Sequence, residues 1–243
     1  MLVTTNRSAR LEASPDGNWR FEGWWFGHVA AGVTSRSTGP SQLLSGMQPV
    51  AAQVEAEQVH GASIAVIGRR QGFPGPIPGC DALMTHLPGV ALLIRTADCI
   101  PMFFADPVRG AVGIAHVGWR GLAAELPMRF VAAFRHAYHS RAEQLQVAIG
   151  PSIRACCYEV GSDFPPQFAQ FLQDHPGRQV CDLVGMAVAQ LRRCGVRPGH
   201  IADAQRCTGC EPQQWFSLRR EGPATGRLTS AIMLRSRRMR GER

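Results

Sequence analysis

The sequence predicts a single-domain α/β protein, a layered sandwich in which helices cover a mixed sheet. The chain has 243 residues, 45% of them hydrophobic, which is enough for one well-buried core and short for two domains. Near-continuous apolar runs at 90–95, 100–105 and 111–117 predict strands that are covered on both faces. Helical patterns at 121–138 and 182–194 complete the α/β alternation.

The first half of the chain predicts strands and loops. Residues 1–20 are polar and contain the turn signal Ser14-Pro15-Asp16-Gly17, so we expect a loosely ordered lead-in there. Alternating residues predict a strand at 63–67, and a short strand is expected at 81–85. The Gly/Pro-rich segment between them, residues 72–79, cannot be helical and can lie beside a pocket.

The second half predicts two helices. After residue 121, apolar residues recur every four positions, at Leu122, Leu126, Phe130, Phe134 and Tyr138. Pro127 either kinks this helix or marks its first turn, with 121–126 as a separate turn. A strand is expected at 145–150, and the helix over 182–194 should stop at Gly195.

Charge and composition limit the functional classes. The net charge is +8, but much of the excess lies in the segment 235–243, which predicts a basic tail beyond a catalytic domain at 21–234. Such a tail would bind polyanions weakly and without sequence preference, so no specific nucleic-acid partner is expected. We find no apolar run of about 18 residues and no signal peptide pattern, which favours a cytoplasmic protein without a membrane partner. The eight cysteines are then expected to be reduced.

Three short segments end strand-like runs with a side chain that can bind metal. They carry His60, Cys99 and His116. Two imidazoles and a thiolate suit zinc, and three protein ligands leave one coordination position open, as in catalytic sites. The spacings match no compact finger, so the ligands must converge through the fold; buried structural residues are the alternative.

The motifs around these residues resemble the YfiH family, also called the laccase-domain or multicopper polyphenol oxidase family. The resemblance extends from about residue 30 to the C-terminus and rests on QVHG, TADCIP and AHVGWRGL, followed by AIGPSIRACCYEVG and the segment from CTGC to TGR. It implies a fold related to Cys/His hydrolases, with zinc at His60, Cys99 and His116 as the catalytic metal. Family members carry an Asn-rich stretch before QVHG, whereas residues 37–57 contain no asparagine.

The resemblance also implies the activity. We expect a purine nucleoside phosphorylase, a transferase that uses phosphate to convert adenosine or inosine into free base and ribose 1-phosphate, with guanosine and methylthioadenosine as further candidates. Adenosine deaminase activity, a hydrolase reaction, is expected at the same site, with weak phenol oxidation. The His-x-Glu signature of zinc nucleobase deaminases is absent, so the proton shuttle is unidentified.

Four more residues are candidates for substrate binding. The planar guanidinium groups of Arg36 and Arg120 match phosphate geometry, although Arg120 could instead cap the turn before the helix. Asp98 and Asp81 could orient a ligand imidazole or carry a proton. A turn-capping role is the alternative for both carboxylates.

Several rival interpretations stay open. A four-copper laccase would need about ten histidines with His-x-His pairs, whereas the chain has eight and no such pair; a copper-dependent phenol oxidase, with Cu(2+) in the site, remains an alternative. A metal-free hydrolase would use Cys99 as nucleophile and His116 as base. A basic interaction module and the choice between monomer and homodimer also stay open.

Two further motifs are given no role in the site. Cys207 and Cys210 form a CxxC, but no second CxxC completes a four-ligand set, so a separate metal or redox site is not predicted. Trp19, Trp24 and Trp25 are expected to be core or interface anchors.

Overall fold

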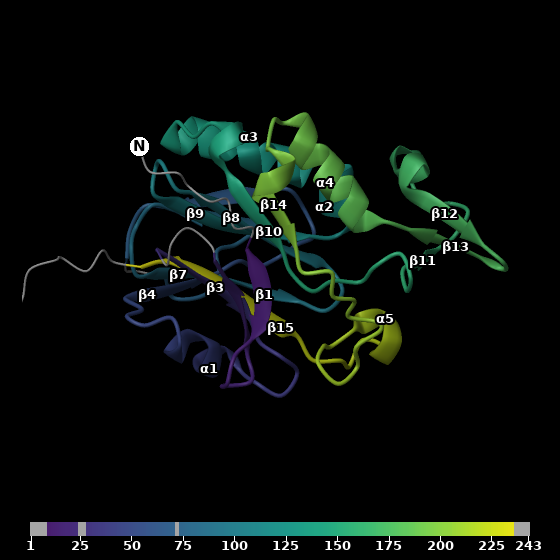
Figure 1. The fold of residues 1–243 in the computed structure, drawn as a ribbon, viewed down its shortest axis with the longest axis horizontal. Coiled ribbons are helices and arrows are strands. Elements are labelled where there is room, and N and C mark those ends of the chain that lie inside the picture. Colours follow the sequence, from purple (N-terminus) through teal and green to yellow (C-terminus); the bar gives the residue numbers. More distant parts are fainter. Residues whose placement is uncertain (1–8, 24–27, 71–72, 236–243) are drawn as a thin grey trace, which may run out of the picture.

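The computed structural model describes residues 9–23, 28–70 and 73–235, and two six-stranded sheets form its centre (Figure 1). The first sheet is mixed, because β4 pairs with β7 in parallel and its other pairs are antiparallel. Its strands, in spatial order, are β1 (Arg10–Ala13), β2 (Trp19–Glu22), β3 (Val29–Val33), β15 (Leu228–Leu234), β7 (Val90–Thr96) and β4 (Ala52–Glu55).

The second sheet is also mixed, with parallel pairs at both edges and antiparallel pairs in the middle. Its strands, in spatial order, are β14 (Ile201–Asp203), β10 (Gln146–Ile149), β8 (Ile100–Asp106), β9 (Ala111–Val117), β6 (Ala82–Thr85) and β5 (Ile64–Ile67). A separate small sheet consists of β11 (Glu159–Val160), β13 (Arg178–Cys181) and β12 (Leu172–His175).

The helices lie on the outer faces of the two large sheets (Figure 1). One side of the molecule carries α1 (Pro40–Ser45), whose Leu43 and Leu44 pack on the first sheet. The second sheet is covered by α2 (Trp119–Ala123), α3 (Leu126–Tyr138) and α4 (Leu183–Arg193). The remaining helical segments are η2 (Ala142–Gln144), η3 (Pro166–Phe171), η4 (Pro198–His200) and α5 (Leu218–Glu221).

The main core lies between the sheets, where side chains such as Leu92 and Ile232 of the first sheet meet Phe103 and Ile114 of the second. The predicted α/β sandwich with a mixed sheet is confirmed. The finer expectation that helices cover both faces is wrong, because the inner face of each sheet packs on the other sheet. A continuous apolar run shows that both faces are buried, but it does not show what buries them.

Local signals explain the helix boundaries. Pro127 stands in the first turn of α3 and α2 is separate, so the second of the two expectations for Pro127 is confirmed, as its fixed φ favours a helix start. Asp182 caps α4 by accepting a hydrogen bond from the backbone N–H of Gly185 at 2.8 Å.

The N-terminal segment differs from the prediction. Residues 10–22 form the antiparallel hairpin β1–β2, which extends the first sheet, so the loosely ordered lead-in is wrong for this part. The ring of Trp19 lies 5.3 Å from that of the buried Trp215. Two of the expected anchors, Trp24 and Trp25, lie outside the described residues. So does 236–243, which is most of the predicted basic tail.

In the described part of the chain, we find no helix with the length and apolar character that a membrane crossing requires.

Candidate active site

Three loops and strand ends bring His60, Cys99 and His116 together between the two sheets. His60 lies in the loop after β4, Cys99 in the connection from β7 to β8, and His116 near the end of β9. Their candidate donor atoms all lie within 4.8 Å of one another, and the two imidazole rings meet edge to face with centroids 4.8 Å apart. The fold therefore brings together three residues that are far apart in the sequence, as the predicted metal site requires.

Asp81 contacts two of these three residues, His60 and His116, and orients them. Its buried carboxylate accepts hydrogen bonds from the backbone N–H groups of His60 at 2.9 Å and Gly61 at 2.7 Å, and it lies 2.8 Å from Nδ1 of His116. With Nδ1 held by Asp81, Nε2 of His116 is the nitrogen left to bind a metal. A carboxylate that fixes an imidazole in this way raises its basicity as a ligand.

Cys99, His116 and Asp81 stabilise one another's charged forms. Burial would raise the pKa of the Cys99 thiol, but hydrogen bonds to His116 and His60 outweigh it and lower that pKa to about 6. Burial opposes the imidazolium of His116, yet Asp81 and Cys99 raise its pKa to about 9. Burial likewise opposes the Asp81 carboxylate, and the hydrogen bond from His116 holds its pKa below the usual range. Without a metal, these contacts favour the thiolate of Cys99 beside the imidazolium of His116.

The donor set fits a transition metal. Two imidazoles and one thiolate are borderline and soft ligands of the kind that zinc and copper prefer. Gly118 keeps room beside them, because a Cβ on this residue would lie 3.1 Å from Sγ of Cys99 and 3.5 Å from Cδ2 of His60. A metal would replace the proton that lies between Cys99 and His116, because a cysteine binds metal as thiolate and a histidine as neutral imidazole.

Backbone strain concentrates around the same residues. Gln58, His60 and Asp98 have positive φ angles of 65°, 60° and 91°, in the region that non-glycine residues avoid. The Gln58 side chain holds its loop by bridging to the backbone of Arg95, accepting from its N–H at 2.7 Å and donating to its carbonyl at 2.6 Å. Such strain is kept where surrounding contacts fix the geometry of a functional site.

The Asp98 carboxylate binds two groups that are not part of the donor set. Its Oδ1 accepts a hydrogen bond from the Thr208 hydroxyl at 2.6 Å and its Oδ2 accepts one from the backbone N–H of Arg219 at 2.7 Å. The predicted role of Asp98 in holding a ligand or carrying a proton is therefore not supported. It ties the Cys99 segment to the turn after β14 and to α5.

A cavity of about 440 Å³ opens beside the three donors. It falls in the size range of small-molecule sites. Its wall includes Pro76 of the Gly/Pro-rich loop, which therefore lies beside a pocket as expected. The apolar Leu218, the carboxylate Glu57 and the guanidinium groups of Arg95 and Arg227 also line it.

The two arginines predicted to bind substrate, Arg36 and Arg120, lie outside this cavity. Arg36 donates to the carbonyl of Pro212 at 2.6 Å, pairs with Glu221 at 3.0 Å and lies over the ring of Phe216. Arg120 is exposed on α2, with its guanidinium 4.7 Å above the Trp119 ring. Neither lines the cavity. Arg95 and Arg227 were missed, although Arg95 directly precedes TADCIP and Arg227 ends the segment from CTGC to TGR, because the pairing of β7 and β15 is what brings them together at the cavity.

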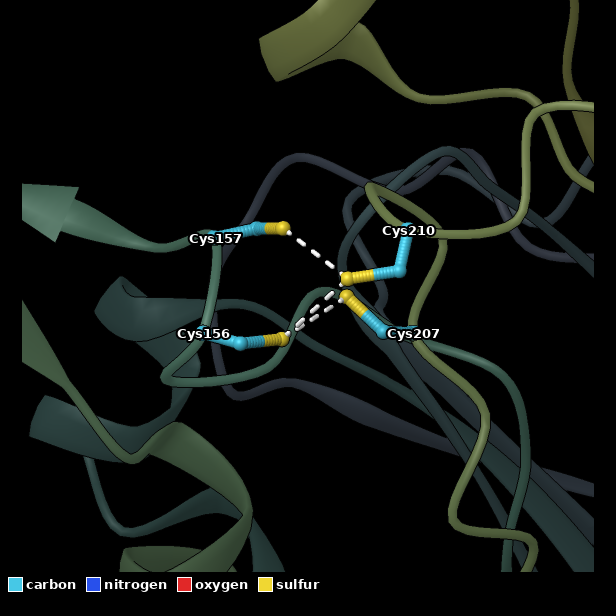
Figure 2. A group of neighbouring side chains, drawn as sticks. All are labelled: Cys156, Cys157, Cys207 and Cys210. Atoms are coloured by element: carbon cyan, nitrogen blue, oxygen red, sulfur yellow. Dashed lines mark hydrogen bonds between the residues drawn. The ribbon is translucent and has the colours of Figure 1, made fainter.

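The CxxC also differs from the sequence interpretation. Cys156 and Cys157 lie beside Cys207 and Cys210, and the four donor atoms are within 4.8 Å of one another (Figure 2). The expectation that nothing completes the four-ligand set is wrong. The missing pair is an adjacent dipeptide some fifty residues earlier, a spacing that matches no second CxxC.

Fold and site together define an α/β domain in which two histidines and a cysteine converge beside a cavity at the junction of two sheets. The family model for multi-copper polyphenol oxidoreductase laccase matches residues 40–235. The chain belongs to this family, which confirms the resemblance found in its motifs, and it is an enzyme.

Relatives and solved structures agree with this assignment. The purine nucleoside phosphorylase YlmD of Geobacillus stearothermophilus is 36% identical over 199 residues, which cover 76% of this chain and 73% of the relative. The adenosine deaminase RL5 of an unknown prokaryotic organism is 33% identical over 194 residues, 74% of each chain. The crystal structure of YlmD from G. stearothermophilus matches with a TM-score of 0.82 and 31% identity, covering 93% of this chain and 99% of that one.

Proposed function

We propose that this protein is a zinc-dependent purine nucleoside phosphorylase that also deaminates adenosine in the same pocket. The observation that carries the proposal is the convergence of His60, Cys99 and His116 on a cavity lined by Arg95 and Arg227. The names of the relatives, which include both activities, support the two reactions. Adenosine and inosine are the proposed substrates, and the domain at 21–234 is proposed to work in the cytoplasm, where free thiols persist.

Zinc is the proposed metal. A blue-copper centre adds a weak axial ligand, most often methionine and sometimes glutamine, to two imidazoles and a thiolate. No methionine is among the described residues that line the cavity, and the side chain of Gln58, which lines it, is bound to the backbone of Arg95. Zinc with three protein ligands keeps a fourth position for water or substrate. When bound, it would supply Lewis acidity and activate water for attack on the purine ring.

The chain's own residues would hold phosphate and nucleoside. In phosphorolysis, a phosphate oxygen bonds to C1′ of ribose, the bond from C1′ to N9 of the purine breaks, and the proton of hydrogen phosphate passes to the base. Arg227 is placed to bind phosphate, since its guanidinium donates to the carbonyls of Thr225 and Gly226 and has further N–H groups for a bidentate contact. Arg95 binds Glu55 through Nε and Nη2, and its remaining Nη1 would be the group offered to substrate.

The test is base release from adenosine and inosine with and without phosphate. We expect free base and ribose 1-phosphate only when phosphate is present. Arg227→Gln should raise the KM for phosphate about 10-fold or more, since hydrogen bonds to charged groups contribute about 1.5–3 kcal/mol. The control is Arg129→Gln, an exposed arginine on α3 that also donates to a backbone carbonyl. Equal base release without phosphate would contradict phosphorolysis.

A second candidate function rests on the same three side chains. The thiol of Cys99, the imidazole of His116 and the carboxylate of Asp81 are arranged as a nucleophile, a base and an orienting acid, as in a metal-free Cys/His hydrolase. Chelation separates the candidates. Removal of the metal should abolish phosphorolysis, whereas a Cys/His hydrolase would keep its full rate.

A further inference from the structure

A second cluster of possible metal ligands lies outside the catalytic pocket. Cys156 and Cys157 project from the connection that follows β10, and Cys207 and Cys210 project toward them from the turn after β14 (Figure 2). Sγ of Cys156 lies 3.5 Å from that of Cys207 and 3.4 Å from that of Cys210, and Sγ of Cys157 lies 3.3 Å from that of Cys210.

We propose that these four cysteines bind a second zinc ion in a closed structural site. Tetrahedral zinc with bonds of about 2.3 Å to sulfur places its ligands about 3.8 Å apart, close to the separations in this cluster. All four thiols are free, and a disulfide would bring two sulfurs to about 2.0 Å. Four protein ligands leave no open position, so this zinc would hold the fold together and take no part in the chemistry.

The two turns are built to stay in contact. Gly209, inside the CxxC, passes so close to Cys157 that a Cβ would lie 2.8 Å from both Cβ and Sγ of that residue. The guanidinium of Arg220 donates to the carbonyls of Thr208 at 2.6 Å and Gly209 at 3.0 Å. These contacts fix the turn with Sγ of Cys207 and Cys210 facing the other pair.

Nearby charge suits a zinc–thiolate centre. Zinc with four thiolates has a net charge of −2, which needs cations or N–H donors around it. Arg220 binds the CxxC turn, and Arg178 reaches the carbonyl of Cys156 at 3.5 Å. Arg154, at the start of the other turn, pairs with Asp203 at the end of β14. Arg220 also pairs with Glu221, whereas Arg178 has no carboxylate partner among the described residues.

The proposed zinc site would also support the catalytic pocket. Thr208 follows Cys207 directly, and its hydroxyl binds Asp98, the residue before Cys99. The second metal would therefore position the Cys99 segment without touching substrate.

The test is zinc content per chain, measured on protein purified with a reductant. We expect two zinc ions in the wild type and one in the double variant Cys156→Ser/Cys210→Ser, which keeps His60, Cys99 and His116. Cys99→Ala should also hold one zinc, bound at the four cysteines. Cys194→Ser, at a half-buried thiol outside both clusters, should hold two. These outcomes do not depend on which reaction the enzyme catalyses.

A second measurement covers the case in which the double variant does not fold. Cobalt(II) loaded into Cys99→Ala should show the strong sulfur-to-metal charge-transfer absorption of a four-thiolate site. The double variant Cys99→Ala/Gly209→Ala, loaded with cobalt in the same way, should show a weaker absorption. A Cys99→Ala protein that binds neither zinc nor cobalt would overturn the proposal. So would a disulfide among the four cysteines in protein kept reduced throughout purification.

Discussion

Oδ1 of Asp81 lies 2.8 Å from Nδ1 of His116, across a pair of neighbouring strands whose register places Ala82 opposite Ala115. The same carboxylate binds the backbone of His60 and Gly61. One buried acid thus fixes two of the three proposed metal ligands. The geometry of the centre depends on a residue that does not touch the metal.

Asp81→Asn should therefore weaken metal binding about 10- to 100-fold, the usual effect of losing a carboxylate behind a ligand histidine. Both oxygens of the native carboxylate accept a hydrogen bond from a backbone N–H. In either orientation, the NH₂ group of the asparagine would therefore face an N–H donor, and that hydrogen bond would be lost. Competition with a chromogenic chelator measures the change. The control is Asp174→Asn on β12, at a carboxylate that accepts a hydrogen bond from Gln179 on β13. Equal affinity in the two variants would contradict this role for Asp81.

Thr208→Val should lower the free energy of unfolding by about 1–3 kcal/mol, because it leaves one oxygen of the buried Asp98 carboxylate without its partner. Thr96→Val is a matched control: the Thr96 hydroxyl is buried and has no hydrogen-bond partner among the described residues. Denaturant titration of both variants gives the difference. If Thr208→Val is as stable as the control, the link between the two cysteine-bearing loops is energetically unimportant.

Gly118→Ala should reduce metal retention, since the added Cβ would crowd Sγ of Cys99 at 3.1 Å and displace it from a shared ligand position. Gly68→Ala adds the same methyl group where no atom lies within 4 Å, and it should keep wild-type metal content. Metal analysis after dialysis against a weak chelator compares the two. Full retention in Gly118→Ala would show that the site has more room than this geometry allows.

Arg36→Lys should cost stability and leave phosphate binding intact. A lysine cannot bind the Pro212 carbonyl and Glu221 at once while stacking on Phe216, so we expect a loss of about 1 kcal/mol in the free energy of unfolding. The KM for phosphate should stay at the wild-type value. A large rise in that KM with unchanged stability would return Arg36 to the phosphate site.

The sequence predicted what depends on local pattern. Apolar runs located β7, β8 and β9, and Pro127 located the start of α3. It did not predict the division of these strands between two sheets, because an apolar run is the same whether a helix or a second sheet covers it. The hairpin β1–β2 was missed because each strand has only four residues, two of them polar, on either side of the turn signal at 14–17.

The candidate site shows the same limit. His60, Cys99 and His116 stand in recognisable motifs, and the structure brings them together. Arg227 reaches the cavity through the pairing of β15 with β7, and Cys156 reaches the CxxC through the bridge between Ser152 and Cys207. Both are long-range contacts that no local spacing encodes.

The central claim is that one metal pocket catalyses both reactions, and Cys99→Ala tests it most directly. Inosine phosphorolysis and adenosine deamination are measured on this variant and on Cys194→Ser, after circular dichroism has shown that both are folded. We predict that Cys99→Ala loses both activities by more than about 100-fold, because a catalytic metal contributes several kcal/mol, while Cys194→Ser keeps both. A Cys99→Ala protein that retains either reaction at the wild-type rate would contradict the shared metal pocket.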